Sequence, residues 1–218
     1  EHLMSPAEED LAAELNLSGG SAWGKLYNNL SSQISVTVER DGETVDLPMS
    51  QVRNLAHERD RDLRRMGYEA EIAAWERNAL PLAAAMNGIK GQVNTLAKRR
   101  GWRSPLDEAC FDNHIDRATL DAMMTAARES FPDFRRYLRA KARALGLDAL
   151  TWYDLFAPIG DNPRVWSWDD ARAFIVRHFH SYSERMGAFA ERAFAERWID
   201  AEPRPGKRDG AFCMPLRD

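Results

Sequence analysis

The sequence has few cysteines, no long apolar run and no excess of basic charge. Its only cysteines are Cys110 and Cys213, too few and too far apart for a disulfide framework, which indicates a reduced, cytoplasmic protein. No apolar run approaches the roughly 18 residues of a membrane span, and the N-terminus shows no secretory signal. Acidic residues outnumber basic ones, 34 to 30. We therefore expect neither nucleic acid nor a membrane as a partner.

Common catalytic and metal-binding signatures are also missing. No P-loop, G-x-S-x-G or G-x-G-x-x-G sequence occurs. His57 opens a sequence like H-E-x-x-H, but Arg61 stands where the second histidine belongs. Cys110 and His114 have the spacing of two ligands on a helix without a third or fourth. The histidines of His178-Phe179-His180 would point to different sides of a helix. We predict no catalytic residue and no metal ligand in this sequence.

One basic segment keeps an alternative open. Lys98-Arg99-Arg100-Gly101-Trp102-Arg103 interleaves a tryptophan with basic residues, as phosphate-binding and nucleic-acid-binding segments do. The competing interpretation is a solvated helix C-terminus, where the helix dipole favours positive charge. The acidic net charge of −4 favours this second interpretation.

Helical periodicity dominates the rest of the sequence. Ser5-Pro6-Ala7-Glu8 has the pattern of a capping box with proline in the first turn. From about residue 60 to 100 apolar residues recur at helical spacing, and Pro81 should kink or split that helix. Gly88 and Gly91 predict the close approach of a second helix. Phe131-Pro132 is expected to interrupt a later helix that begins near residue 116 and resumes through 145.

Extended structure is expected in three places. Residues 34–38 and 44–47 alternate apolar and polar side chains, and Asp41-Gly42 between them favours a hairpin over about 34–47. Residues 150–156 predict a short strand or a buried extended linker. A short strand is also expected at the C-terminal end. The predicted fold class is mainly α, a multi-helix array with a small β-hairpin near the N-terminus and a short C-terminal strand.

We expect three regions along the chain. Residues 1–58 would hold N-terminal helices and the hairpin, residues 59–200 a helical region, and residues 201–218 a loop followed by the start of an edge strand.

Six stretches, in order along the chain, carry a resemblance to one family. They are Leu17–Tyr27, Asn87–Ala97, Arg100–Asp107, Phe131–Tyr137, Trp152–Pro158 and Trp198–Cys213. Together they resemble the oligoendopeptidase F family, relatives of thimet oligopeptidase. Members are mostly helical zinc peptidases with a deep channel that admits peptides.

The resemblance implies a zinc site built from an H-E-x-x-H helix and a further glutamate. In the family these residues follow the stretch that resembles Gly206–Cys213, and this sequence is expected to stop before them. No zinc ligand or general base is therefore carried over, and the chain alone is expected to be inactive. Residues 59–200 would form part of the peptidase domain and channel wall. Short peptides would be the partners of the complete enzyme.

The resemblance also implies a substrate-binding site. Gly210, Ala211, Phe212 and Cys213 are similar to the strand that borders the peptide groove, where a substrate backbone adds as a further strand. The competing interpretation is an ordinary strand paired within a sheet, or a frayed terminus. For the whole chain the alternative is a non-catalytic helical module that binds peptides or proteins. Faces left exposed by truncation would favour self-association.

Overall fold

A computed structural model describes residues 2–40, 42–160, 165–202, 204, 206–207 and 210. The chain falls into two compact units, each described separately below. The first is Glu1–Ile159 with Arg204–Asp218, and the second is Gly160–Pro203. The predicted region boundaries near residues 58 and 200 stay predictions.

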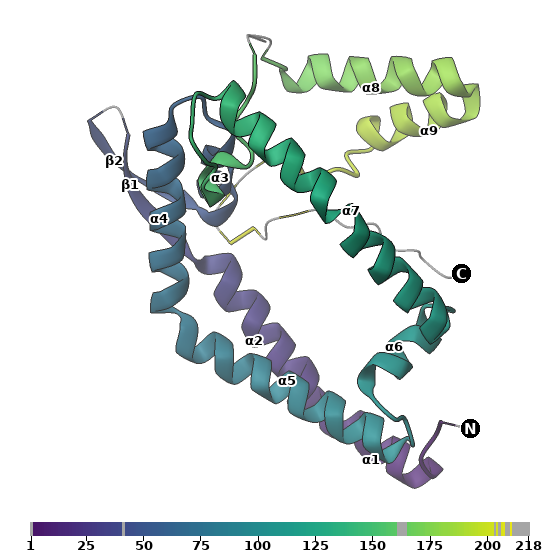
Figure 1. Ribbon diagram of the computed structural model, residues 1–218. Helices are drawn as coiled ribbons and strands as arrows, with labels where there is room; N and C mark the ends of the chain where they lie inside the picture. Colours follow the sequence, from purple (N-terminus) through teal and green to yellow (C-terminus); the bar gives the residue numbers. More distant parts are fainter. Residues whose placement is uncertain are drawn as a thin grey trace. The chain divides into compact units, whose positions relative to one another are not determined.

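The elements follow one another as shown in Figure 1. The first unit contains α1 (Pro6–Ser18), α2 (Gly20–Gln33), β1 (Ser35–Arg40), β2 (Glu43–Pro48), α3 (Met49–Asn54), the 3-10 turn η1 (Leu55–His57), α4 (Arg61–Arg77), α5 (Ala79–Arg99), α6 (Pro105–Asp112), α7 (Arg117–Ala144) and the 3-10 turn η2 (Trp152–Asp154). The second contains α8 (Trp168–Tyr182) and α9 (Glu184–Ala195). The mainly α class with an N-terminal hairpin is confirmed. The predicted C-terminal strand lies outside the described residues.

The hairpin forms where the alternation predicted it. Strands β1 and β2 pair antiparallel, with Val36 opposite Leu47 and Val38 opposite Val45. Gly42 in the turn has a φ of 82°, which glycine adopts without steric cost. Val36 and Val38 point to one face and are buried. That face packs with α3 and α4 to form the core of the unit, which comprises Ile34, Val36, Val38, Leu47, Met49, Val52, Leu55, Ala74 and Leu82.

The long helical stretch after residue 60 is split, as Pro81 predicted. Helix α4 ends at Arg77 and α5 begins at Ala79, with Asn78 between them. Pro81 lies in the first turn of α5, where a backbone N–H has no intrahelical acceptor and its loss costs little.

The close helix approach predicted at Gly88 is confirmed. Helix α2 packs along α5 (Figure 1), and Trp23 of α2 lies against Gly88. A Cβ atom built on Gly88 would stand 2.7 Å from two atoms of the Trp23 ring. A Cβ atom on Gly91 would meet nothing within 4 Å. Only Gly88 of the pair therefore has a packing reason to be glycine.

Two local predictions are wrong. Helix α7 runs through Pro132 without interruption, because its 28 residues retain many other backbone hydrogen bonds when proline removes one. Residues 150–156 contain the 3-10 turn η2 instead of a strand. Thr151 and Asp154 close that turn as a capping box, so local side-chain hydrogen bonds prevail over the β propensity of the aromatic residues.

In the second unit, α8 and α9 contact each other closely. The His180 ring of α8 lies directly against Gly187 of α9, leaving no room for a Cβ atom there. His180 Nδ1 is 3.0 Å from Glu184 Oε2, and its Nε2 is 3.2 Å from Glu191 Oε1. The hydrogen bond with Glu184 is the main cause of a raised pKa of His180, and the bond with Glu191 adds to it although partial burial opposes it.

We expect His180 to make the stability of this unit depend on pH. Because the folded-state pKa is raised above the ordinary value of 6.5, the contribution is fully present below pH 6.5 and is lost as the pH rises through the folded pKa. Urea unfolding at several pH values would measure how the free energy of unfolding falls with rising pH. His180→Gln should remove this pH dependence. His178→Gln is the matched control. A pH dependence unchanged in His180→Gln would contradict the expectation.

Candidate functional site

The predicted substrate strand is described at only one position. Gly210 lies in a bend with a φ of 95°, in the left-handed region that favours glycine. Ala211, Phe212 and Cys213 lie outside the described residues. The substrate-binding role of these four residues stays a prediction.

The residues considered as metal ligands do not assemble into a site. Cys110 is buried in α6, whereas His114 follows the helix with a φ of 54° and is exposed. Within the described part of the chain, no three His, Cys, Asp or Glu side chains come together in a way that could hold a metal ion. The described residues therefore do not fit the zinc ion that the resemblance implies.

The basic segment at the end of α5 forms contacts within the protein. Arg100 Nη2 lies 2.8 Å from Glu9 Oε2 of α1. A side-chain hydrogen bond from Arg100 is the main cause of a lowered pKa of Glu9. The ring of His2 stacks on Trp102 with 3.5 Å between ring centroids. Arg100 and the face of the Trp102 ring are thus occupied by contacts within the protein, although phosphate or base recognition would need them. These contacts favour the interpretation of the segment as an ordinary helix C-terminus.

A buried cluster of charges holds the turn η2 in place. The Asp154 carboxylate is completely buried and accepts hydrogen bonds from two arginines of α4. Arg61 donates through Nε and Nη2 at 3.0 Å each, and Arg64 donates through Nη2 at 3.1 Å. The Thr151 hydroxyl donates to Oδ2 at 2.6 Å and its backbone N–H at 3.0 Å. Both oxygens of the Asp154 carboxylate therefore accept hydrogen bonds, as a buried carboxylate requires.

Electrostatics keep this carboxylate ionised. Burial alone would raise the pKa of Asp154, but the hydrogen bonds from Arg61, Thr151 and Arg64 outweigh burial and hold the pKa far below its ordinary range. Lys141 of α7 is also buried and donates from Nζ to the Leu155 carbonyl oxygen at 2.6 Å. The turn is thus attached to both α4 and α7.

The same turn presents aromatic side chains at the surface. Trp152 is 69% exposed and Phe156 is 60% exposed. With Tyr68 of α4 and His57 of η1 they line a pocket of about 450 Å³. The rings of His57 and Phe156 lie 5.3 Å apart between centroids. Sequence reasoning missed the buried charge cluster that holds this turn, because Arg61 and Arg64 are about 90 positions away from Asp154. The T-x-x-D pattern of Thr151 and Asp154 was the one local signal for the turn.

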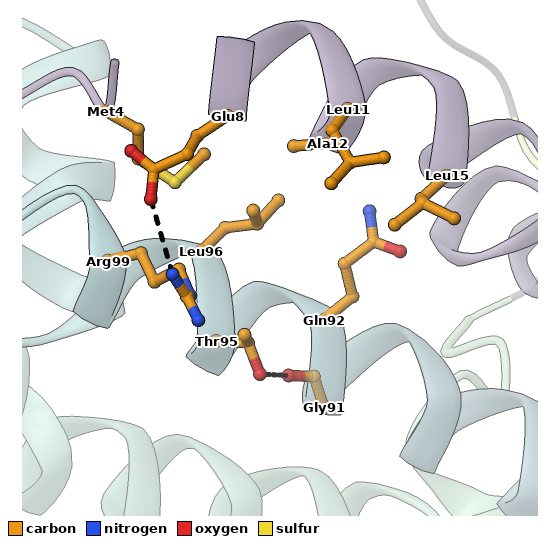
Figure 2. Close-up of a pocket in the computed structure, with 10 residues that line it drawn as sticks. All are labelled: Met4, Glu8, Leu11, Ala12, Leu15, Gly91, Gln92, Thr95, Leu96 and Arg99. Carbon is orange, nitrogen blue, oxygen red and sulfur yellow. Dashed lines mark hydrogen bonds and ion pairs between the residues drawn. The ribbon is translucent and has the colours of Figure 1, made fainter.

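A second pocket, of about 410 Å³, lies between α1 and α5 (Figure 2). Met4, Leu11 and Leu15 of the N-terminal segment face Leu96 of α5 across it, and the pocket is mainly apolar. Arg99 and Glu8 form an ion pair of 3.4 Å at its edge. Such a pocket suits an aliphatic side chain, and its lining contains no nucleophile paired with a base.

No family model matches the chain. Known proteins do resemble it over nearly its whole length. It is 27% identical to the group B oligopeptidase PepB of Streptococcus agalactiae, over 97% of the chain and 35% of that protein. It is 22% identical to the oligopeptidase PepF of Bacillus subtilis, over 97% of the chain and 32% of that protein. The chain thus spans about a third of the length of these curated relatives.

Solved structures show the same fold. A putative oligoendopeptidase F from Bacillus anthracis superposes with a TM-score of 0.76 at 15% identity, over 89% of this chain and 36% of that one. The oligoendopeptidase F of Enterococcus faecium gives a TM-score of 0.65 at 21% identity, over 94% and 44%. The fold is therefore one found in peptidases. The chain is a relative of proteins named oligopeptidases and oligoendopeptidase F, and the resemblance found in its sequence is confirmed.

No helix in the described part of the chain is both long and apolar enough to cross a membrane.

Proposed function

We propose that the chain is part of an oligopeptide-cleaving zinc metalloendopeptidase, in which it supplies walls of the peptide channel. The supporting observation is the match to proteins named oligopeptidases and oligoendopeptidase F over 97% of the chain. Because the chain spans about a third of their length, the remaining parts of the enzyme would come from elsewhere in a longer protein. The complete enzyme acts in the cytoplasm on short peptides.

The zinc ion belongs to the part of the enzyme that this chain does not supply. No group of described residues could hold it, and the sequence has no complete H-E-x-x-H motif. The chain alone is therefore inactive in this proposal. In the complete enzyme the metal would polarise the scissile carbonyl and activate water.

Substrate backbone binds, in this proposal, at the edge strand Gly210, Ala211, Phe212 and Cys213. An extended edge offers main-chain donors and acceptors to any peptide, so it gives affinity with little demand on sequence. The left-handed φ of Gly210 would turn the chain into that strand.

The test compares the chain with the full-length gene product. We expect the full-length protein to cleave a fluorogenic oligopeptide in a chelator-sensitive way, and the chain alone to be inactive with added zinc. Chelator-sensitive hydrolysis by the chain alone would contradict the proposal, as would a full-length protein without such activity.

Proline substitutions test the edge strand in the full-length protein. Neighbouring N–H groups of a strand point to opposite sides, so one of Ala211→Pro and Phe212→Pro should raise KM by about tenfold, the effect of losing a hydrogen bond of about 1.4 kcal/mol. Ala211→Ser retains the N–H and is the control. An unchanged KM in both proline variants would refute substrate binding at this strand.

The pocket between α1 and α5 favours a second candidate, a non-catalytic module that binds apolar peptide segments. Its apolar lining is half exposed, with Leu11 at 56% and Leu15 at 60%. Titration with peptides carrying aliphatic side chains would detect binding, and Leu15→Asp should weaken it. A full-length protein with chelator-sensitive peptidase activity would rule out the non-catalytic candidate.

A further inference from the structure

Helix α7 carries a regular apolar stripe along one face. Apolar residues recur at intervals of three or four positions, which places them on the same side of a helix. They are Leu120, Met124, Ala127, Phe131, Phe134 and Leu138, referred to below as the α7 stripe. At 1.5 Å per residue the stripe extends over roughly 27 Å.

Within the first unit, the described residues leave the middle of the α7 stripe uncovered. Met124 is 48% exposed, Phe131 46% and Phe134 61%. Met123 and Tyr137 flank the stripe and are exposed as well. Helix α7 is attached near its ends, where it contacts α6 and where Lys141 binds the Leu155 carbonyl. Ala142, one turn beyond Leu138 on the same side of the helix, is buried, whereas the middle of the stripe between these attachments is exposed.

The other side of α7 has a different composition. Ala122, Glu129, Asp133, Arg136 and Ala140 lie opposite the stripe, and all are exposed. A solvated helix face normally carries such small and charged residues. Met124, Phe131 and Phe134 instead follow one another along one face of the helix, and such apolar patches are usually buried against other surfaces. The composition of the charged side of α7 is that of a solvated face, and the composition of the α7 stripe is that of a contact surface.

We propose that the α7 stripe is the docking surface for an amphipathic helix from the part of the full-length protein that this chain does not span. A stripe with intervals of three and four residues fits the packing of one helix along another. The relatives are about three times as long as their match to this chain, which covers 35% and 32% of two of them. A longer protein of that kind would contain the residues for a covering helix. The inference rests on the proposed function only in placing the chain within a longer protein.

Other occupants fit the surface less well. The residues of the stripe line neither of the two pockets described above, and the face of a single helix is convex, whereas sites for short ligands are concave. A second copy of the chain would cover the stripe only when the covering part of the protein is missing. The isolated chain is accordingly expected to self-associate through it.

Methionine oxidation tests the proposal without altering the sequence. Peroxide oxidises solvent-accessible methionines, and mass spectrometry locates the product. In the folded full-length protein we expect Met123 and Met124 to oxidise at least about tenfold more slowly than in the same protein unfolded in urea. Met49, buried in the hairpin core, is the internal standard for protection. Rates for Met123 and Met124 equal to those of the unfolded protein would overturn the proposal.

Charge substitutions in the full-length protein provide the second test. Phe131→Glu with Phe134→Glu should lower the Tm by at least about 5 °C, since two charges would enter an apolar interface. Ala122→Glu with Ala140→Glu makes the same change of net charge on the opposite side and should leave the Tm nearly unchanged. Equal Tm values for the first pair and the unmodified protein would overturn the proposal.

Dilution and activity separate the remaining outcomes. Protection of Met123 and Met124 that disappears on dilution to the monomer would assign the stripe to a second copy and overturn the proposal. A full-length protein that protects these methionines but shows no chelator-sensitive peptidase activity would support the docking surface while refuting the proposed function.

Discussion

Replacing Asp154 with alanine is expected to destabilise the first unit by about 3–5 kcal/mol, because it leaves the buried guanidinium of Arg64 without its counter-charge. Arg64 is 4% exposed and its guanidinium would lose the carboxylate 3.1 Å away. The Thr151 hydroxyl and backbone N–H would lose their acceptor as well. Urea unfolding at pH 7, followed by circular dichroism, measures the change.

Asp121→Ala is the matched control for Asp154→Ala. Asp121 also pairs with an arginine, at 3.3 Å, but it is 63% exposed. Solvent screens such a pair, so its removal should cost no more than about 0.5 kcal/mol. Equal stability losses for the two variants would show that Asp154 is not buried with its arginines in solution.

Acid should remove the contribution of Asp154. Because its folded-state pKa lies below the ordinary value of 3.8, the stabilisation is present above about pH 4 and declines as the pH falls further. The difference in stability between the unmodified protein and Asp154→Asn should therefore shrink in acid. A difference that stays constant from pH 7 to pH 3 would contradict this mechanism.

Gly88→Leu is expected to destabilise the packing of α2 on α5 by about 1–3 kcal/mol. The new side chain would need the space that the Trp23 ring occupies, 2.7 Å from the position of its Cβ atom. Either the ring leaves its place or the two helices separate. Chemical unfolding measures the loss, and the total tryptophan emission, to which Trp23 contributes, should change at the same time.

Gly91→Ala controls for the chemistry of the substitution. Gly91 is in the same helix, and a Cβ atom there would meet nothing within 4 Å. Alanine should therefore stabilise α5 by about 0.5–1 kcal/mol, since glycine loses more backbone entropy on folding. A destabilised Gly91→Ala would indicate that another surface packs there.

Local patterns predicted much of the secondary structure. The capping box at Ser5 and Glu8 forms as expected, and so does the hairpin around Gly42. Each depends on interactions between residues a few positions apart, which are visible in the sequence. Pro132 misled the prediction for the same reason, because a local rule against proline does not count the hydrogen bonds of a 28-residue helix.

The candidate sites were less predictable. Arg61 and Arg64 look like solvated helix residues until Asp154, about 90 positions later, is placed between them. The exposed positions of Trp152 and Phe156 also run against the expectation that aromatic residues of a short apolar stretch are buried. No local rule states how a distant carboxylate lowers the cost of burying an arginine.

Sequence alone was enough for the helical class, the hairpin, the glycine at the helix contact and the resemblance to oligoendopeptidase F. These follow from periodicity, short-range hydrogen bonding and matching stretches of residues. Only the folded chain showed that Asp154 is buried between two arginines, that Trp23 covers Gly88 rather than Gly91, and that α7 leaves an apolar stripe exposed. Each of these depends on desolvation, and whether a side chain loses its water is decided by residues far away in the chain.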